Sequence, residues 1–378
     1  MSDKDLRKSV TATHPGEILK DILLGHGMSQ KELAAAIGKT TPVVNDILSK
    51  KRDINVEIAV LLEAIFEETP ATFWIDLQSK FDLELARLSK KVQDLERGIR
   101  EWKSLGEYIS LRTVKKRAGI GESVISDLAY LCTLYNVDTV DNLKVSLANT
   151  FRSAYFKKSE VLQTDQKNLN TWILLTRISN DHQKLSVPFS LNRIKDLINQ
   201  LNDIFYLNKN TIENVKAVLN EYGIRFFIEK KLDKVPVDGY SFWRGDNPTI
   251  VVTTRYSWLD NLAFTIFHEL GHIVKHLFHD KTQDFLDMIE PGNEEKNEES
   301  EKEANEFASE CLRRGCDLNS VFRRIINPFS STATLQRISQ NYGINEGILV
   351  GQYQFFCKTI LNHPSAFAIG AKLRQKIK

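Results

Sequence analysis

The residues best suited to chemistry in this sequence form the pattern His268-Glu-Leu-Gly-His272. Four residues make slightly more than one helical turn, so the two imidazoles lie on one face, about 6 Å apart. Two imidazoles at that spacing can bind one tetrahedral Zn²⁺ ion. Glu269 lies about 100° around the helix, beside the metal, where its carboxylate can accept a proton from a zinc-bound water. The alternative is a buried helix whose histidines make ordinary hydrogen bonds.

A catalytic zinc ion takes three protein ligands and leaves one position open, so we expect one zinc per chain and a third ligand elsewhere. The acidic segment 297–314 offers Glu301 and Glu303. Helical spacing favours Glu301, because it shares the small, apolar face that must pack on the zinc helix. Asn305, one turn further on, is placed to hydrogen-bond a ligand imidazole. The alternative is a solvated acidic surface, as in most acidic runs.

Two further histidines extend the row on the same helix. His276 is about 12 Å along the axis from His268, so these two rings cannot share one ion. We interpret His276 as a packing or hydrogen-bonding neighbour of the site and His279 as a surface residue. The candidates for stabilising an oxyanion are Tyr240, Arg255 and Tyr256.

Short strands are expected ahead of the zinc helix. Runs of β-branched and aromatic residues, bounded by Gly, Pro and Asp, predict strands at 224–230, 240–243 and 249–254. Ser257 and Asp260 fit a capping box, which predicts that the zinc helix begins there and continues to about Phe278.

A second functional pattern lies near the N-terminus, where residues 28–55 predict two short helices joined by a tight turn at Gly38. Ser29 and Glu32 fit a capping box, and Pro42 fits the first turn of the second helix. A helix-turn-helix places the start of its second helix in the major groove of DNA, with basic residues at the phosphates. A plain helical hairpin is the alternative. The predicted DNA contacts are Gln30, Lys39, Thr41, Val43, Asn45, Lys50, Lys51 and Arg52.

The pattern along the chain predicts a mainly α protein with a small α+β C-terminal domain. Residues 1–80 are expected to form the helix-turn-helix bundle, 81–210 a helical middle region, and 211–378 the zinc domain with a short β-sheet. Within the middle region, residues 83–102 keep apolar residues three and four apart, with opposite charges between them.

Composition excludes several classes of protein. Apolar residues make up 42% and charged residues 26%, as in soluble globular proteins, and the net charge of +2 means that a nucleic-acid surface must be local. No apolar run approaches the roughly 20 residues of a membrane helix. The N-terminus lacks the apolar segment of a signal peptide, and four scattered cysteines do not make a disulfide framework. We therefore expect a cytoplasmic protein without membrane contact.

The strands followed by FHELGHIVKH and EKEANEFA resemble the ImmA/IrrE family of metallopeptidases, over roughly residues 210–350. The resemblance implies a gluzincin-like zinc site with His268, His272 and a helical glutamate as ligands and Glu269 as base. It also implies a narrow substrate range, typically one regulatory protein cut at one place.

The segments HPGEILKDILL and AVLLEAIFEETPATFW resemble the HigA-type XRE repressor-antitoxins, over residues 14–85. This resemblance implies a homodimer on a palindromic operator in double-stranded DNA, and it allows a HigB-like toxin as partner. The middle segments NTFRSAYFKKS and TWILLTRIS resemble longer fused forms of this family.

Two functions follow from these observations. The first is a DNA-binding regulator with a zinc-dependent endopeptidase that cleaves a regulatory protein, either a repressor or a partner. The alternative is a HigA-type antitoxin and autorepressor that neutralises a HigB-like toxin and whose zinc domain is sensory or structural. The intact Glu269 favours the enzyme, because a structural zinc needs no general base and prefers four protein ligands.

Overall fold

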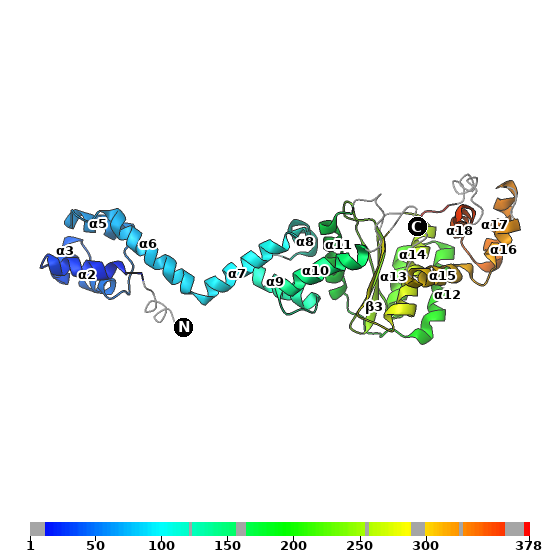
Figure 1. The fold of residues 1–378 in the computed structure, drawn as a ribbon, viewed down its shortest axis with the longest axis horizontal. Helices are drawn as coiled ribbons and strands as arrows, with labels where there is room; N and C mark the ends of the chain where they lie inside the picture. The colour runs from blue at the N-terminus through cyan, green and yellow to red at the C-terminus, as the bar shows by residue number, and fades with distance from the viewer. Residues whose placement is uncertain are drawn as a thin grey trace. The chain divides into compact units, whose positions relative to one another are not determined.

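The computed structural model describes residues 12–120, 123–155, 164–253, 257–288, 299–324, 328–359 and 374–378. The chain divides into two compact units, Met1–Lys103 and Ser104–Lys378. Helices dominate both units and a four-stranded sheet lies in the second, which confirms the predicted fold class (Figure 1). The division into regions 1–80, 81–210 and 211–378 stays a prediction.

The first unit is a bundle of short helices around one apolar core. Its helices are α2 (Pro15–Gly25), α3 (Gln30–Ala36), α4 (Thr41–Leu48), α5 (Val56–Ile65) and α6 (Ala71–Leu88). Each helix contributes an apolar stripe at three and four spacing, as a helix packed on one side requires. Buried members of this core are Leu19, Leu33, Ala34, Val44, Ile47, Leu62 and Trp74.

The predicted capping box at the start of α3 is confirmed. The backbone N–H of Ser29 donates to the Glu32 carboxylate over 2.8 Å, and that of Glu32 donates to the Ser29 hydroxyl over 3.3 Å. Gly38 ends the turn with φ +64°, a conformation that favours glycine. Helices α2 and α4 approach so closely that a Cβ on Gly16 would lie 2.1 Å from the carbonyl oxygen of Ile47.

Helix α7 (Lys90–Leu105) follows α6, so residues 83–102 are helical as expected but divide between two helices. Ser89 has an extended backbone, with φ −69° and ψ 117°, and its carbonyl accepts from the N–H of Gln93 over 3.0 Å. Serine is unfavourable inside a helix, because its hydroxyl competes for backbone hydrogen bonds, but it is favoured at helix ends. This explains why one helix ends and the next begins at Ser89.

Helices of the second unit cover both faces of its sheet. Before the sheet come α8 (Leu111–Ala118), α9 (Val124–Leu134), α10 (Val140–Tyr155), α11 (Gln166–Asp181), the 3₁₀ turn η1 (Leu191–Arg193), α12 (Ile194–Leu207) and α13 (Thr211–Glu221). After β3 come α14 (Leu259–His272), the π-helical turn η2 (Ile273–Leu277), α15 (Glu299–Arg313), α16 (Leu318–Arg324), α17 (Pro328–Tyr342) and α18 (Glu346–Thr359).

The sheet has the strand order β1-β3-β2-β4. Strands β1 (Arg225–Glu229), β2 (Val237–Arg244) and β3 (Asn247–Thr253) confirm the three predicted strands, whereas β4 (Asp284–Met288) was not predicted. β1 pairs with β3 in parallel, and the other pairings are antiparallel. β4 therefore forms one edge of the sheet.

The two faces of the sheet carry different cores, because successive side chains of a strand point to opposite faces. On one face, Trp172 of α11 packs with Tyr240 and Val251. On the other, Ile250 and residues of α12, α13 and α14 form the largest core of the chain. Figure 1 shows the sheet edge-on between α11 and these helices, so α14 is held against one face.

The predicted capping box at Ser257 and Asp260 is wrong. Helix α14 begins at Leu259 after Trp258, without a side-chain cap. Instead, the described C-terminal segment pairs with this stretch: Leu259 N–H donates to Gln375 O over 3.0 Å, and Arg374 binds Asp260 over 2.9 Å. Contacts with a distant segment of the chain thus take the place of a local side-chain cap at the start of α14.

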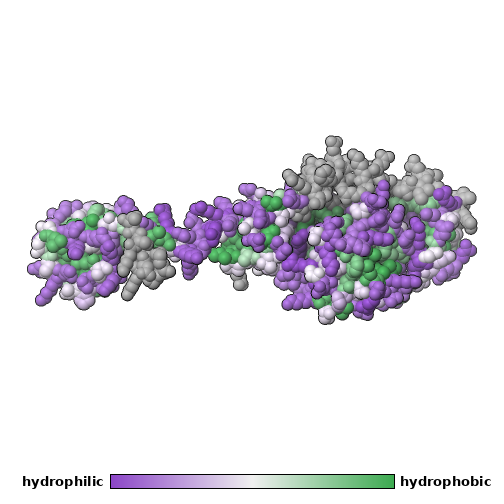
Figure 2. Space-filling model, turned by 60° about the horizontal axis from the view of Figure 1, so that its bottom comes forward, coloured by the Kyte–Doolittle hydropathy of each residue, from purple (hydrophilic) through white to green (hydrophobic). Residues whose placement is uncertain are grey.

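Among the described residues, no helix has the length and apolar character needed to cross a membrane. On the face drawn in Figure 2, hydrophilic side chains predominate on the surface and hydrophobic ones appear as separate patches. All four cysteines are buried free thiols.

Candidate functional site

Helix α14 buries the whole histidine–glutamate pattern. His268, Glu269 and His272 are 2%, 0% and 1% exposed. Helix α15 can approach this face because residue 271 is glycine: a Cβ on Gly271 would lie 3.0 Å from Cα of Ala304. The close crossing brings Glu301, one turn before Ala304, to the two imidazoles.

Glu301 completes a three-donor group with the two histidines. Its carboxylate oxygens lie 3.4 Å from Nε2 of His268 and 3.7 Å from Nε2 of His272, and the two Nε2 atoms are 3.0 Å apart. Donors of one tetrahedral zinc ion, with bonds of about 2.0–2.1 Å, lie about 3.3 Å from one another. The three donors therefore fit a single metal ion, and this cluster is a possible metal site.

Asn305 lies where the sequence predicted a partner for a ligand imidazole. Its Oδ1 is 3.0 Å from Nδ1 of His268. An amide oxygen at that position accepts the Nδ1 proton, which leaves the Nε2 lone pair directed at the donor group. The ring of His272 is instead oriented by Phe285, which stacks on it with 4.2 Å between ring centroids.

Glu269 is buried, yet neither of its carboxylate oxygens has a hydrogen-bond partner among the described residues. A buried polar group without a partner is unusual and costs free energy, so it indicates a role with a group bound from outside. Gly239 of β2 makes the space, since a Cβ there would lie 2.1 Å from Oε1 of Glu269. Burial raises the pKa of Glu269 to about 8. The nearby His268 opposes this rise, and the carboxylate of Asp287 adds to it.

The two histidines differ in their affinity for protons. Burial lowers the pKa of His272 to about 4, so its imidazole is neutral and able to act as a ligand. Burial also opposes protonation of His268, but the carboxylates of Glu301, Asp287 and Glu269 together outweigh burial, and the pKa of His268 rises to about 9. A metal ligand must be deprotonated, so binding a cation here releases the proton of His268.

The turn after His272 separates the remaining histidines from the cluster. The chain widens into the π-helical turn η2, a feature often found at functional sites. His276 Nε2 then bonds to the carbonyl of Ser300 over 3.1 Å, and its Nδ1 lies 3.7 Å from Glu303. Thus Glu301 and not Glu303 is near both Nε2 atoms, although its role as a ligand stays a prediction. His279 is exposed, as expected.

Strand β4 adds two residues that the sequence analysis missed. Phe285 and Asp287 share the face of Gly239 and Ser241, because they pair with these residues of β2. Asp287 forms a second group of potential ligands with His268 and Glu269. The available signal was the short run DFLDM, followed by the turn-forming Pro291-Gly292.

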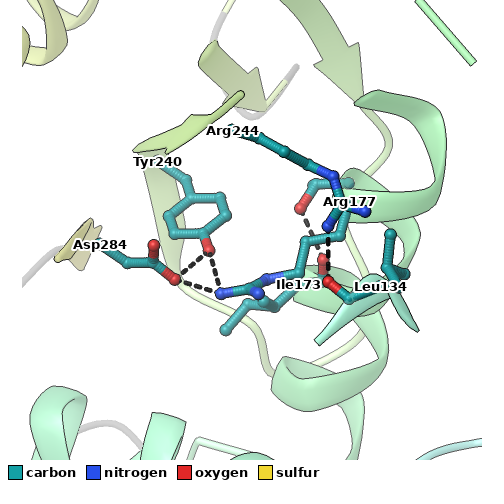
Figure 3. Close-up of polar contacts among 7 residues, drawn as sticks. Leu134, Ile173, Arg177, Tyr240, Arg244 and Asp284 are labelled. Carbon is teal, nitrogen blue, oxygen red and sulfur yellow. Dashed lines mark hydrogen bonds and ion pairs between the residues drawn. The ribbon is translucent and has the colours of Figure 1, made fainter. Parts of the chain in front are cut away.

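A network of ionic and polar contacts holds α11 against the opposite face of the sheet (Figure 3). Arg177 of α11 donates to Asp284 of β4, and the Tyr240 hydroxyl donates to the same carboxylate oxygen over 2.7 Å. Because Tyr240 points to α11 while the metal cluster lies on the α14 side, Tyr240 is wrong as a residue for stabilising an oxyanion. The other two candidates, Arg255 and Tyr256, lie outside the described residues.

In the first unit, most predicted DNA contacts lie on the surface of the helix-turn-helix. Gln30, Thr41 and Asn45 are exposed. Val43 is half-buried against the core of the unit, which corrects its expected outward position. It lies one position before the buried Val44, so the core reaches part of its side chain.

The basic residues divide into two groups. Lys39 pairs with Glu57 over 2.7 Å, and Lys50 pairs with Glu17, so these two ammonium groups are partly neutralised within the unit. Lys51 and Arg52 are exposed at the end of the motif. The latter two are therefore the better candidates for contacts with phosphate.

Comparison with known proteins identifies one domain in each of the two units. Residues 219–349 match the IrrE N-terminal-like domain (Peptidase_M78), and residues 19–73 match a helix-turn-helix domain. Virulence-associated proteins A′ and A of Dichelobacter nodosus are 36% identical over 70 residues and 32% identical over 79 residues. The matched segments cover 18% and 21% of this chain, and 61% and 78% of those relatives.

Among solved structures, antitoxin HigA of Pseudomonas aeruginosa, determined with the higBA promoter, is similar. It is 38% identical, covers 22% of this chain and 89% of that chain, and has a TM-score of 0.21. The chain thus belongs to the helix-turn-helix proteins through residues 19–73 and carries an IrrE N-terminal-like domain at residues 219–349.

Proposed function

We propose that this chain is an operator-binding regulator whose C-terminal unit is a zinc-dependent endopeptidase acting on a regulatory protein. One observation carries the enzymatic half of the proposal. The buried donors His268, His272 and Glu301 form one group, and His268 also lies beside a buried carboxylate, Glu269, whose oxygens have no hydrogen-bond partner among the described residues. A structural metal site gives no reason to retain such a carboxylate.

Each residue of the cluster has a distinct part in this proposal. His268, His272 and Glu301 would hold the metal ion, and Asn305 would fix the tautomer of His268. Zn²⁺ bound there supplies a Lewis acid that lowers the pKa of water and polarises a peptide carbonyl. Glu269 then removes a proton from the attacking water and delivers it to the leaving amine.

The substrate class follows from the family of the domain and from its fusion to a helix-turn-helix. A peptidase attached to an operator-binding unit is suited to a regulatory protein that acts at the same promoter. The test is incubation of the zinc-loaded protein with the products of neighbouring genes, followed by mass spectrometry. Fragments that form with zinc and disappear with a chelator support the proposal, and intact proteins under both conditions contradict it.

The metal site leads to a prediction about affinity. The purified protein should hold about one Zn²⁺ per chain, because three protein donors and one open position form a complete catalytic site. Asn305→Ala should weaken zinc binding by about 10–100-fold, since the amide orients His268. Competition with a chelating dye measures both values.

Glu301→Gln and Glu303→Gln form a matched pair for the same measurement. The first removes a buried carboxylate near both imidazoles, whereas the second removes one that is 48% exposed and paired with His276. Zinc affinity should fall only in Glu301→Gln. Equal affinity in Glu301→Gln and the unchanged protein would remove Glu301 from the ligand set.

The DNA-binding half of the proposal depends on the exposed start of α4. Thr41 and Asn45 lie at or near the N-terminus of the second helix of the motif, which a helix-turn-helix inserts into the major groove. Lys51 and Arg52 supply positive charge beside it. We propose that a homodimer binds a palindromic operator with half-sites about 10–10.5 bp apart.

Lys51→Ala with Arg52→Ala should weaken binding to operator and to random DNA alike. Each lost phosphate contact should reduce the slope of log affinity against log salt by about 0.9. Asn45→Ala should instead relax the preference at one or two base positions while leaving the salt slope unchanged. Fluorescence anisotropy across a salt series checks both, and a double variant with full affinity for both DNAs would contradict the assignment.

An antitoxin and autorepressor that neutralises a HigB-like toxin is the second candidate function. It is favoured by the match of residues 19–73 to a helix-turn-helix domain, a unit that is sufficient for repression without catalysis. Glu269→Gln distinguishes the two functions, because this substitution leaves the helix-turn-helix unit unchanged. An antitoxin with this substitution still represses its promoter and neutralises the toxin. A peptidase with this substitution no longer cleaves its target protein.

A further inference from the structure

Helix α7 carries an exposed row of apolar side chains. Val92, Leu95 and Ile99 are 43%, 44% and 50% exposed. They follow one another at intervals of three and four residues, so they form one stripe along the helix. A contiguous apolar stripe on the surface indicates an interaction site, because isolated exposed residues would not align.

The stripe follows the heptad repeat of a coiled coil. If Val92 occupies position a, Leu95 is at d and Ile99 at the next a. The exposed seam ends there, because Trp102 at the next d is only 7% exposed. Position a thus holds β-branched residues, and the first position d holds leucine. This combination favours two parallel strands, because each side chain fits the hole formed by four residues of a parallel partner.

We infer that α7 pairs in parallel with α7 of a second copy of this chain. In a parallel dimer, position g faces position e of the following heptad on the partner, five residues further along. Lys91 is at g and Glu96 is at e, so the two-fold axis generates two pairs of opposite charge. Glu96 is held on its own helix by Arg100, one turn further on. An antiparallel pair would bring g to g, and this match of charges would be lost.

The parallel arrangement has a consequence for DNA. It places the two helix-turn-helix motifs at the same end of the dimer, as two half-sites of a palindrome require. The inference goes beyond the proposed function, because operator binding requires a dimer but does not identify the surface that forms it. Dimerisation is measured without DNA, so a failure of operator binding would not count against pairing through α7.

Sedimentation velocity of the full chain tests the surface. The unchanged protein should sediment as a dimer of twice 43.3 kDa at micromolar concentration. Leu95→Lys should give a monomer, because it places two like charges in the apolar seam. Gln93→Lys, which adds the same side chain on the outer side of the same helix, should stay dimeric. Circular dichroism should show unchanged helix content in both, since both positions are exposed.

Two further variants test the register and the orientation. Lys91→Glu should weaken the dimer by placing like charges at g and e, and Lys91→Glu with Glu96→Lys should restore it. Val92→Cys should form an intermolecular disulfide on mild oxidation, because equal a positions face each other only in a parallel pair. The native cysteines are buried and should not interfere.

Three results would overturn the inference. A monomeric unchanged chain removes the second copy as the occupant of the stripe. A dimer that persists in Leu95→Lys shows that another surface forms it. Absence of the Val92→Cys crosslink in a protein that is dimeric by sedimentation excludes the parallel orientation.

Discussion

Glu269→Gln should lower the peptidase rate by about 10²–10⁴-fold, the usual effect of removing a general base. Glutamine keeps the volume of the side chain but cannot accept the proton of the attacking water. Glu269 lies beside His268 and Asp287, and by geometry neither of its oxygens has a hydrogen-bond partner among the described residues. The one polar neighbour that lowers its pKa through a hydrogen bond is the Ser241 hydroxyl, which can also bond to a glutamine. The measurement is kcat on a protein that the cleavage screen identifies, together with the zinc content of the variant.

The zinc content determines how a loss of activity is interpreted. If Glu269 is a base and not a ligand, Glu269→Gln retains its zinc. Loss of both zinc and activity would instead support the second group of donors, His268, Glu269 and Asp287. Glu303→Gln is the matched control, because it makes the same chemical change on a side chain that faces His276. It should keep both zinc and full activity.

Much of the candidate metal site could be predicted from helical geometry alone. Residues four apart on α14 share a face, and the spacing along α15 brings Glu301 rather than Glu303 to that face. The position of Asn305 follows from the same argument, since it lies one turn beyond Glu301. These residues were predictable because each depends on the periodicity of a single helix and on one packing contact between two helices.

The residues that the sequence did not reveal depend on contacts between distant segments. Strand β4 has only five residues, and its partner β2 lies on the other side of α14 in the sequence. Nothing local shows that Asp287 pairs with Gly239 or that Phe285 stacks on His272. The start of α14 was mispredicted for the same reason, because the C-terminal segment replaces the local cap.

The sequence analysis overlooked Gly239, yet the structure gives it a specific part in the site. Its partner across the sheet is Asp287, and its Cα faces the carboxylate of Glu269. A methyl group at this position would lie 2.1 Å from Oε1 and 2.9 Å from Cδ of Glu269, closer than nonbonded atoms approach. The glycine therefore determines where the carboxylate of Glu269 can lie.

Gly239→Ala should accordingly reduce peptidase activity by about 10²-fold, the loss expected when a catalytic group moves by about 1 Å. The backbone at Gly239 is not in the left-handed region, so alanine adds no strain of its own. Zinc should stay bound, because the three atoms nearest to the added methyl group all belong to Glu269, which is not one of the three donors. The rate on the identified substrate, the zinc content and the thermal midpoint are measured together.

Gly25→Ala is the matched control for this substitution, since a Cβ there meets no atom within 4 Å. It should leave the rate, the zinc content and the thermal midpoint unchanged. Gly239→Ala with full activity would show that Glu269 can act from another position, and the geometric argument for its role as base would fail. If zinc is lost together with activity, the methyl group has moved α14 as a whole, because His268 and His272 lie on the same helix as Glu269.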